Sequence, residues 1–240
     1  MHTSSSINGH REQLPEIRIL TARGIATVLA VVGSEFERTS RRRLNITIGT
    51  AAALVRRINA GEPFDLFFGA SDFVDTLIED ARIIPSTRTF IAGSMIGMEV
   101  RAGAPKPDIS TVDAFKRALI QAKSIAYLKE GASGIYVARL LERLGIASAI
   151  EAKVTRLETD TVSELVANGE IEMGMVVTTQ ILTTPGVELV GTLPPELQSA
   201  ILFEGAVSAG TDCPDAACKL LKFLSTPDVI AIFKSQGMES

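Results

Sequence analysis

Short apolar runs rich in β-branched residues alternate with helix-length amphipathic segments along almost the whole 240-residue chain. Runs of the first kind occupy 16–22, 44–49, 64–69 and 124–128, and a helical pattern follows each of them. A strand joins a parallel neighbour only through a crossover of a dozen or more residues, which a helix supplies. The alternation therefore predicts an α/β protein with parallel sheets.

Two longer apolar runs interrupt the alternation, at 88–103 and 201–210. The first contains Gly93 and Gly97, so we expect one bent strand there rather than a helix. We interpret both runs as crossing points between two lobes. The expected division is a flexible tail at 1–15, a discontinuous first lobe at 16–84 plus 205–240, and a second lobe at 85–204.

Composition and charge exclude several classes of protein. The chain is 46% hydrophobic and 22% charged with a formal net charge of −4, which indicates a globular protein and argues against general binding to nucleic acids or membrane surfaces. No stretch approaches the roughly 18 apolar residues of a membrane span, so we expect no membrane insertion. The N-terminal stretch lacks the apolar core of a secretory signal. We therefore expect a periplasmic location if a signal peptide was removed, and a cytoplasmic one if residue 1 is the native start.

The positions of histidine and cysteine limit the chemistry further. Both histidines, His2 and His10, lie in the polar N-terminal stretch, so the body of the chain has no imidazole for a catalytic triad or a metal site. Cys213 and Cys218 lie five residues apart in a helical pattern, which is poor geometry for a disulfide. We expect two free thiols, no metal and no cofactor.

Small residues fill three junctions between an expected strand and an expected helix: TARGIA (21–26), GTAAAL (49–54) and EGASGI (130–135). Backbone N–H groups at a helix start lack intrahelical partners and lie at the positive end of the helix dipole, so they attract anions. Small side chains let a ligand approach these groups closely. Ligands of open α/β sheets bind beyond the carboxyl ends of the strands, so we expect the second and third junctions to form two halves of one cradle.

One long segment, NITIGTAAALVRRINAGEPFDLFFGAS, resembles the second loop and helix of the periplasmic molybdate-binding proteins of ABC importers, which are extracellular solute-binding proteins. Further matches, in the same order and spacing over about residues 16–240, are STRTFIAGSMIGMEVRAGAPKPDIST, GASGIYVARLLERLGI, PGVELVGTLPPEL and CKLLKFLSTPDVIAIFKSQGME. The resemblance implies a type II periplasmic-binding-protein-like fold of two α/β lobes with a hinge and an interlobe ligand cleft. It also implies a small anionic ligand held without metal or cofactor, and an ABC permease as partner if the protein is exported. We also expect a monomer.

The sequence departs from the molybdate binders at positions that hold the oxyanion in that family. The family's ligand serine in the first loop falls at Gly24, preceded by Arg23, and its tyrosine in the second lobe falls at Val177. The second loop, 50–53, keeps one hydroxyl, that of Thr50. A guanidinium is gained where hydroxyls are lost, and its planar fork suits a carboxylate. We therefore expect an organic anion with one or more carboxylates instead of molybdate.

The candidate ligand-binding residues lie where expected strands end: Arg23, Gly24, Thr50, Ala51, Ala52, Ala70, Ser71, Lys129, Gly131, Ala132, Ser133, Thr178 and Gln180. Several have simpler explanations. Ser71 and Ser133 are also N-cap candidates, and for Ser71 capping is the favoured role. Lys129 and Glu130 are typical of an exposed charge pair. Gln180 fits a hydrogen bond at the hinge as well as a ligand contact.

Three functions remain open at this point. The first is a solute-binding protein that closes on a small oxyanion or, preferably, a carboxylate. The second is an isomerase on the same scaffold, because some relatives of this family isomerise aconitate by an allylic proton shift. Without a histidine in the body, the proton-transferring base of such an enzyme would be Glu130, Lys129 or Tyr127. The third is a cytosolic ligand sensor that controls a partner protein.

Overall fold

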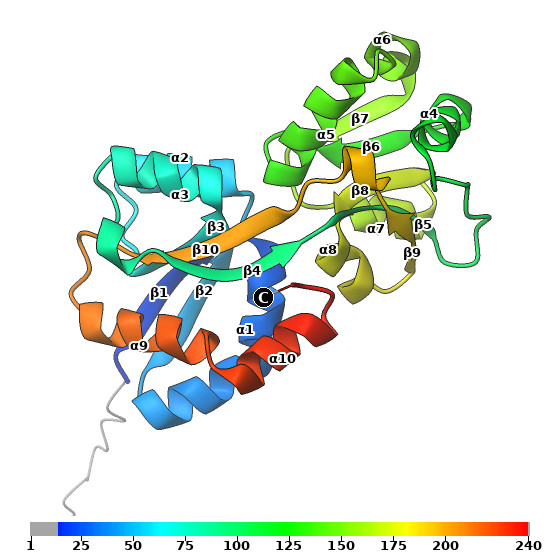
Figure 1. Ribbon diagram of the computed structural model, residues 1–240. Coiled ribbons are helices and arrows are strands. Elements are labelled where there is room, and N and C mark those ends of the chain that lie inside the picture. The colour runs from blue at the N-terminus through cyan, green and yellow to red at the C-terminus, as the bar shows by residue number, and fades with distance from the viewer. Residues whose placement is uncertain (1–13, 240) are drawn as a thin grey trace, which may run out of the picture.

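Residues 14–239, described by a computed structural model, form two α/β lobes that lie side by side (Figure 1). The first lobe contains β1 (Glu16–Thr21), α1 (Arg23–Ser40), β2 (Arg43–Ile48), α2 (Ala51–Asn59), β3 (Leu66–Ala70), α3 (Ser71–Glu79), β4 (Thr89–Ser94), β10 (Ile201–Val207), α9 (Pro214–Leu224) and α10 (Pro227–Ser235). The second contains β5 (Ile96–Arg101), α4 (Val112–Gln121), β6 (Ile125–Leu128), α5 (Ala132–Arg143), α6 (Ala147–Ile150), β7 (Val154–Leu157), α7 (Val162–Asn168), β8 (Met173–Val177), α8 (Thr178–Thr183) and β9 (Val187–Thr192). The predicted tail at 1–15 lies almost wholly outside the described residues, as do His2 and His10.

Each lobe is built on a mixed five-stranded sheet within the described chain. The strand orders are β2-β1-β3-β10-β4 and β7-β6-β8-β5-β9. Strands β1, β2 and β3 are parallel, as are β6, β7 and β8, but β10 and β5 run antiparallel to both of their neighbours. The prediction of parallel sheets is therefore right for β1–β3 and β6–β8 and wrong for the pairs that β10 and β5 make. The antiparallel strands are those next to a connection between the lobes, and they enter their sheets without a helical crossover.

The predicted single strand at 88–103 is two strands. β4 pairs in the first sheet and β5 in the second, with the break at Met95. Beside the break, the Ser94 hydroxyl lies 3.1 Å from the Thr178 hydroxyl and 2.8 Å from the Thr179 hydroxyl. These buried contacts hold the chain where it leaves the first sheet.

Strand membership also bears on the predicted lobe boundaries. β4 and all of β10 belong to the first sheet, whereas the predicted division assigned 85–204 to the second lobe. The lobe boundaries stay a prediction. The sheets favour crossing points at Met95 and within 193–200.

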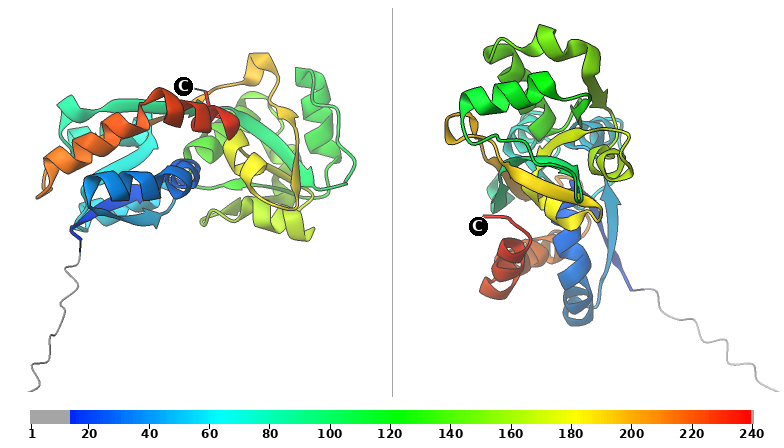
Figure 2. Two further views of the ribbon diagram at one scale, coloured as in Figure 1. Left: turned by 90° about the horizontal axis from the view of Figure 1, so that it is seen from below. Right: turned by 90° about the vertical axis from the view of Figure 1, so that its right-hand side faces the viewer.

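The hydrophobic pattern explains how helices cover the sheets. In α1 the apolar residues Ile25, Val28, Leu29 and Val32 recur at helical spacing, and all four are buried in the main core. Each such side chain contributes about 1.5–3 kcal/mol when it is fully buried. In Figure 2, α9 and α10 pack along the first lobe, and the chain end returns to the junction between the lobes. There the Glu239 N–H donates to the Gly93 carbonyl at 2.8 Å. No helix among residues 14–239 is long and apolar enough to cross a membrane.

Packing requires a glycine at position 134, in the first turn of α5 just after the loop that follows β6. A Cβ atom at Gly134 would lie 1.6 Å from the backbone carbonyl oxygen of Leu128, at the end of β6. No side chain is tolerated there, because the neighbour is backbone and cannot move aside. Gly134 therefore lets the first turn of α5 fold directly over the strand end.

We expect Gly134→Ala to lower the free energy of unfolding by about 3 kcal/mol or more, because the added methyl forces the helix start away from β6. Gly210→Ala is the matched control, since a Cβ there meets no atom within 4 Å and is expected to change stability by less than about 0.5 kcal/mol. Urea unfolding followed by circular dichroism measures both. Equal stability of the two variants would contradict the packing requirement.

Candidate functional site

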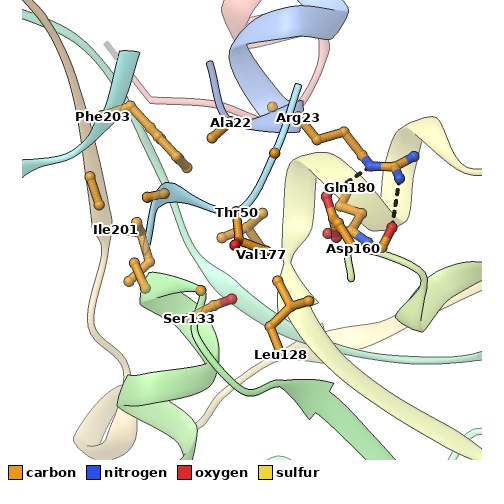
Figure 3. Close-up of a pocket in the computed structure, with 16 residues that line it drawn as sticks. Ala22, Arg23, Thr50, Leu128, Ser133, Asp160, Val177, Gln180, Ile201 and Phe203 are labelled. Atoms are coloured by element: carbon orange, nitrogen blue, oxygen red, sulfur yellow. Dashed lines mark hydrogen bonds and ion pairs between the residues drawn. The ribbon is translucent and has the colours of Figure 1, made fainter. Parts of the chain in front are cut away.

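A pocket lies between the two lobes, at the ends of strands from both sheets (Figure 3). Its cavity volume of about 60 Å³ leaves room for several water-sized groups. The lining residues are Ala22, Arg23, Gly24, Gly49, Thr50, Ala51, Ala70, Leu128, Gly131, Ala132, Ser133, Asp160, Val177, Gln180, Ile201 and Phe203.

Helix starts converge on this pocket from both lobes. Of the helices in the described chain, α1, α2, α3, α5 and α8 have N-cap residues that line it: Ala22, Thr50, Ala70, Gly131 and Val177. Among these helices, only α3 carries an acidic residue in its first turn, at Asp72. The other helix starts keep their positive partial charge, and their first N–H groups have no intrahelical partner. The pocket therefore offers backbone donors to an anion.

Two hydroxyl groups add to these donors. The Thr50 hydroxyl oxygen accepts the N–H of Ala53 at 3.3 Å and so caps α2, while its own O–H remains a donor. Ser133 is buried, and its hydroxyl makes no hydrogen bond with any residue in 14–239. The N-cap of α5 is Gly131, so Ser133 does not cap its helix. Its free hydroxyl is available to a ligand.

Arg23 reaches the pocket, but the protein's own carboxylates hold its guanidinium. Its Nε donates to Asp160 Oδ2 at 2.8 Å, one Nη to Glu164 Oε1 at 3.1 Å and the other Nη to the Asp160 backbone carbonyl at 2.6 Å. Arg23 starts α1 in the first lobe, and its partners lie around the start of α7 in the second. The planar guanidinium of Arg23 does bind carboxylates, but they are carboxylates of the second lobe, so the side chain joins the two lobes. Bidentate binding of a ligand carboxylate by Arg23 stays a prediction.

Asp160 is a pocket residue that sequence reasoning missed. It follows β7 at a strand-to-helix junction, the same signal that marked the other loops, but its neighbours Glu158 and Thr159 are not small. One carboxylate oxygen, Oδ2, bonds to Arg23. The other, Oδ1, is buried and has no hydrogen-bond partner in the described part of the chain. An unpartnered buried oxygen is costly, so this atom calls for a donor from outside the protein.

The two sides of the pocket differ in polarity. Gln180, on α8, is 4% exposed, and its Nε2 has no partner among the described residues. Figure 3 places Gln180 and Asp160 on one side, beside Arg23, and Ile201 and Phe203 on the opposite side. The unpaired polar atoms of Gln180 and Asp160 therefore lie on one side and the larger apolar side chains on the other, with Thr50 and Ser133 between them (Figure 3).

Some sequence candidates lie outside the pocket lining. Ala52, Ser71, Lys129 and Thr178 are not part of it, nor is Glu130. The expected N-cap role of Ser71 is wrong, because Ala70 caps α3 and the Ser71 hydroxyl donates to a backbone carbonyl of β10 at 3.4 Å.

The charged candidates beside the glycine loop have protein partners. Lys129 is half-exposed and pairs with Glu158 at 2.9 Å, and Glu130 pairs with Arg56 across the cleft at 2.6 Å. Tyr127 is buried and accepts a hydrogen bond from Arg156 Nε at 3.0 Å. These contacts favour structural roles for all three residues; their roles in binding or catalysis stay predictions.

A buried carboxyl group lies close to this region. Glu99, on β5, is fully buried, and the Ser163 hydroxyl donates to its Oε1 at 3.0 Å. Burial raises the pKa of Glu99 to about 7; the Ser163 hydrogen bond opposes the shift, and the charges of Glu164 and Asp160 add to it. Room for the carboxyl comes from Gly174, where a Cβ would lie 2.4 Å from Oε1.

The sequence matches the profile of the bacterial extracellular solute-binding protein family over residues 17–239. The chain belongs to this family. Aconitate isomerase from Pseudomonas sp. is 31% identical over 229 residues, which cover 93% of this chain and 87% of that protein. Molybdate-binding protein ModA from Escherichia coli (strain K12) is 24% identical over 230 residues, covering 92% and 88%. The structure of the Azotobacter vinelandii periplasmic molybdate-binding protein superposes with a TM-score of 0.78 at 18% identity, covering 93% and 99%.

These relationships confirm the predicted family and the predicted two-lobed fold. Gly24 and Val177, the positions at which molybdate binders were inferred to carry ligand hydroxyls, both line the pocket of this solute-binding protein. Within 14–239, no three His, Cys, Asp or Glu side chains gather as a possible metal site. The donors present are backbone amides, the hydroxyls of Thr50 and Ser133, the amide of Gln180 and the guanidinium of Arg23, which is held by the protein's own oxygens.

We expect Arg23→Gln to lower the free energy of unfolding by about 1–2 kcal/mol, because it leaves Asp160 and Glu164 without their counter-charge. The value is below that of a fully buried pair because the Arg23 side chain is 35% exposed and solvent screens the loss. Lys106→Gln, which breaks an exposed pair with Glu188, serves as the control and is expected to cost less than about 0.5 kcal/mol. Urea unfolding at low salt tests both; a loss no larger than that of the control would show that the interlobe pair is solvated.

We expect stability to fall as the pH rises from 5 to 8, and Glu99→Gln to remove this loss. The folded state holds the Glu99 proton more tightly than the unfolded state does. The stability that this proton contributes is therefore fully present below the unfolded pKa, and it is lost as the pH rises through the folded pKa of about 7. Between pH 5 and pH 8, the free energy of unfolding of wild type is expected to fall by about 2–3 kcal/mol relative to that of Glu99→Gln. Chemical unfolding across this pH range measures it, and parallel pH profiles of the two proteins would contradict it.

Proposed function

We propose that this protein binds a small organic carboxylate in the pocket between its lobes. The observation that carries the proposal is the uneven lining: Gln180 and Asp160 lie on one side, the apolar side chains of Ile201 and Phe203 on the opposite side, and the hydroxyls of Thr50 and Ser133 between them (Figure 3). A compact tetrahedral oxyanion needs donors on all sides. An organic acid places its carboxylate against the helix starts and its carbon skeleton against the apolar side.

Binding is expected to favour the closed arrangement of the lobes. The pocket takes residues from α2 and β10 on one side and from α5 and α8 on the other, so a ligand in it touches both lobes. A ligand that contacts both halves stabilises the state in which they meet.

We extend the proposal to transport. As a solute-binding protein, the exported form would act in the periplasm as a monomer and deliver its ligand to an ABC permease. Location, oligomeric state and permease are all part of the proposal; of these, the family relationship supports the location.

A second candidate function is isomerisation of an unsaturated carboxylate by an allylic proton shift. It is supported by the 31% identity to aconitate isomerase over nearly the whole chain and by the free Oδ1 of Asp160. In such a reaction one base removes a proton from carbon, the double bond moves, and the same proton returns two carbons away, with no net oxidation. Asp160 is a better candidate base than Glu130 or Lys129, because it lines the pocket.

A thermal-shift panel tests the ligand class. It compares molybdate, tungstate and sulfate with citrate, cis-aconitate, trans-aconitate and other organic acids. A carboxylate present at 100 times its Kd is expected to add about 2.7 kcal/mol, which raises the Tm by roughly 5–10 °C for a chain of this size. Stabilisation by molybdate alone would overturn the proposal.

Controls separate binding from folding and from turnover. Ser133→Ala is expected to keep the ligand-free Tm and to weaken the best carboxylate about tenfold, because the Ser133 hydroxyl has no partner within residues 14–239. Ser235→Ala, on α10 away from the pocket, is expected to change neither. Proton NMR of any hit over hours then distinguishes a binder from an isomerase; an unchanged spectrum in the presence of cis- or trans-aconitate would exclude the second candidate for that acid.

A further inference from the structure

Two buried polar atoms with opposite hydrogen-bonding character lie on the same side of the pocket. Gln180 Nε2 is a donor and Asp160 Oδ1 is an acceptor, and neither has a partner among residues 14–239. Both residues line the pocket, and Figure 3 shows them on the side where Arg23 enters. Unpaired buried polar atoms are rare and costly in native proteins, which points to a bound group that satisfies both.

The local charges restrict what that group can be. Arg23 is the cation at this side of the pocket, and two carboxylates, Asp160 and Glu164, already contact it. One positive charge faces two negative charges, so the surroundings of Asp160 Oδ1 are negative. A deprotonated carboxylate or an oxyanion without hydrogen would be repelled there.

Among the charged and neutral groups that organic acids commonly carry at neutral pH, a hydroxyl fits both atoms. A carboxylate oxygen accepts from Gln180 but repels Asp160, and an ammonium donates to Asp160 but offers nothing to Gln180. A hydroxyl group donates one hydrogen and has two acceptor lone pairs. It is therefore able to donate to Asp160 and accept from Gln180 at the same time.

We propose that Asp160 and Gln180 together recognise a hydroxyl group, so that the preferred ligand is a hydroxy acid. The carboxylate of the acid lies at the starts of α2 and α5, near Thr50 and Ser133, and its hydroxyl lies between Asp160 and Gln180. This inference rests on the proposed binding of carboxylates and names the subclass. It also gives Asp160 the role of a specificity residue.

The test compares acids that share one skeleton and differ at one carbon. L-Malate, succinate and L-aspartate carry a hydroxyl, a hydrogen and an ammonium at the same position, and citrate and tricarballylate form a second pair with and without a hydroxyl. Isothermal titration calorimetry with the full chain is expected to give at least tenfold tighter binding of the hydroxylated member in the series that binds. Equal or tighter binding of the deoxy or amino analogue would overturn the inference and indicate that water bridges the two atoms.

Asp160→Asn tests the assigned residue. Arg23 Nε remains a donor, so the new amide is expected to turn its oxygen to Arg23 and its NH₂ to the pocket, which replaces the acceptor by a donor. The preference for the hydroxylated acid is then expected to fall to threefold or less. Glu164→Gln is the matched control: it removes the other carboxylate that contacts Arg23 but lies outside the pocket lining, and the hydroxyl preference is expected to persist.

The outcomes separate this inference from the proposed function. Carboxylates that bind with no hydroxyl preference would leave the proposed function standing and overturn the hydroxyl site. No binding of any carboxylate would overturn both. Loss of the preference in Glu164→Gln as well as in Asp160→Asn, with the ligand-free Tm of each variant measured alongside, would show that Arg23 placement sets the selectivity and would overturn the role of Asp160.

Discussion

The arrangement of this protein depends on helix starts whose backbone N–H groups meet between two sheets. The N-caps of α1, α2, α3, α5 and α8 all reach one pocket, and α3 alone among them has an acid in its first turn. Peptide dipoles thus supply the attraction for an anion without a free cationic side chain. Glycine and alanine at these junctions follow from the same need, because the backbone has to be approachable.

In the proposed function, selectivity comes from a few side chains added to this backbone frame. Thr50 and Ser133 contribute hydroxyls from opposite lobes, whereas Gln180 and Asp160 contribute an unpaired donor and an unpaired acceptor. Gly24 and Val177, the positions at which the resemblance to molybdate binders implies ligand hydroxyls, carry none here. The same fold can therefore serve inorganic oxyanions or organic acids by changing side chains at loop positions alone.

The sequence predicts local features well and long-range pairing poorly. Strand and helix positions, and the small-residue junctions at Thr50 and Gly131, follow from periodicity and from the physics of helix starts. The antiparallel entry of β5 and β10 does not, because it depends on which sheet each strand joins after crossing between lobes. The partners of Arg23 could not be predicted either, since Asp160 lies 137 residues away and no local pattern links the two. The pairing of Lys129 with Glu158 could not be predicted from the sequence for the same reason.

Ion pairs across the cleft have a consequence for how the empty protein behaves. Within the described residues, three ion pairs join the lobes: Arg23 pairs with Asp160 and Glu164, and Arg56 pairs with Glu130. These pairs stabilise the contact between the lobes, and any movement that separates the lobes has to break them. Dissolved salt screens attractions between exposed charges, so the ion pairs between the lobes weaken as the salt concentration rises. The strength of the contact between the lobes therefore depends on the ionic strength of the medium.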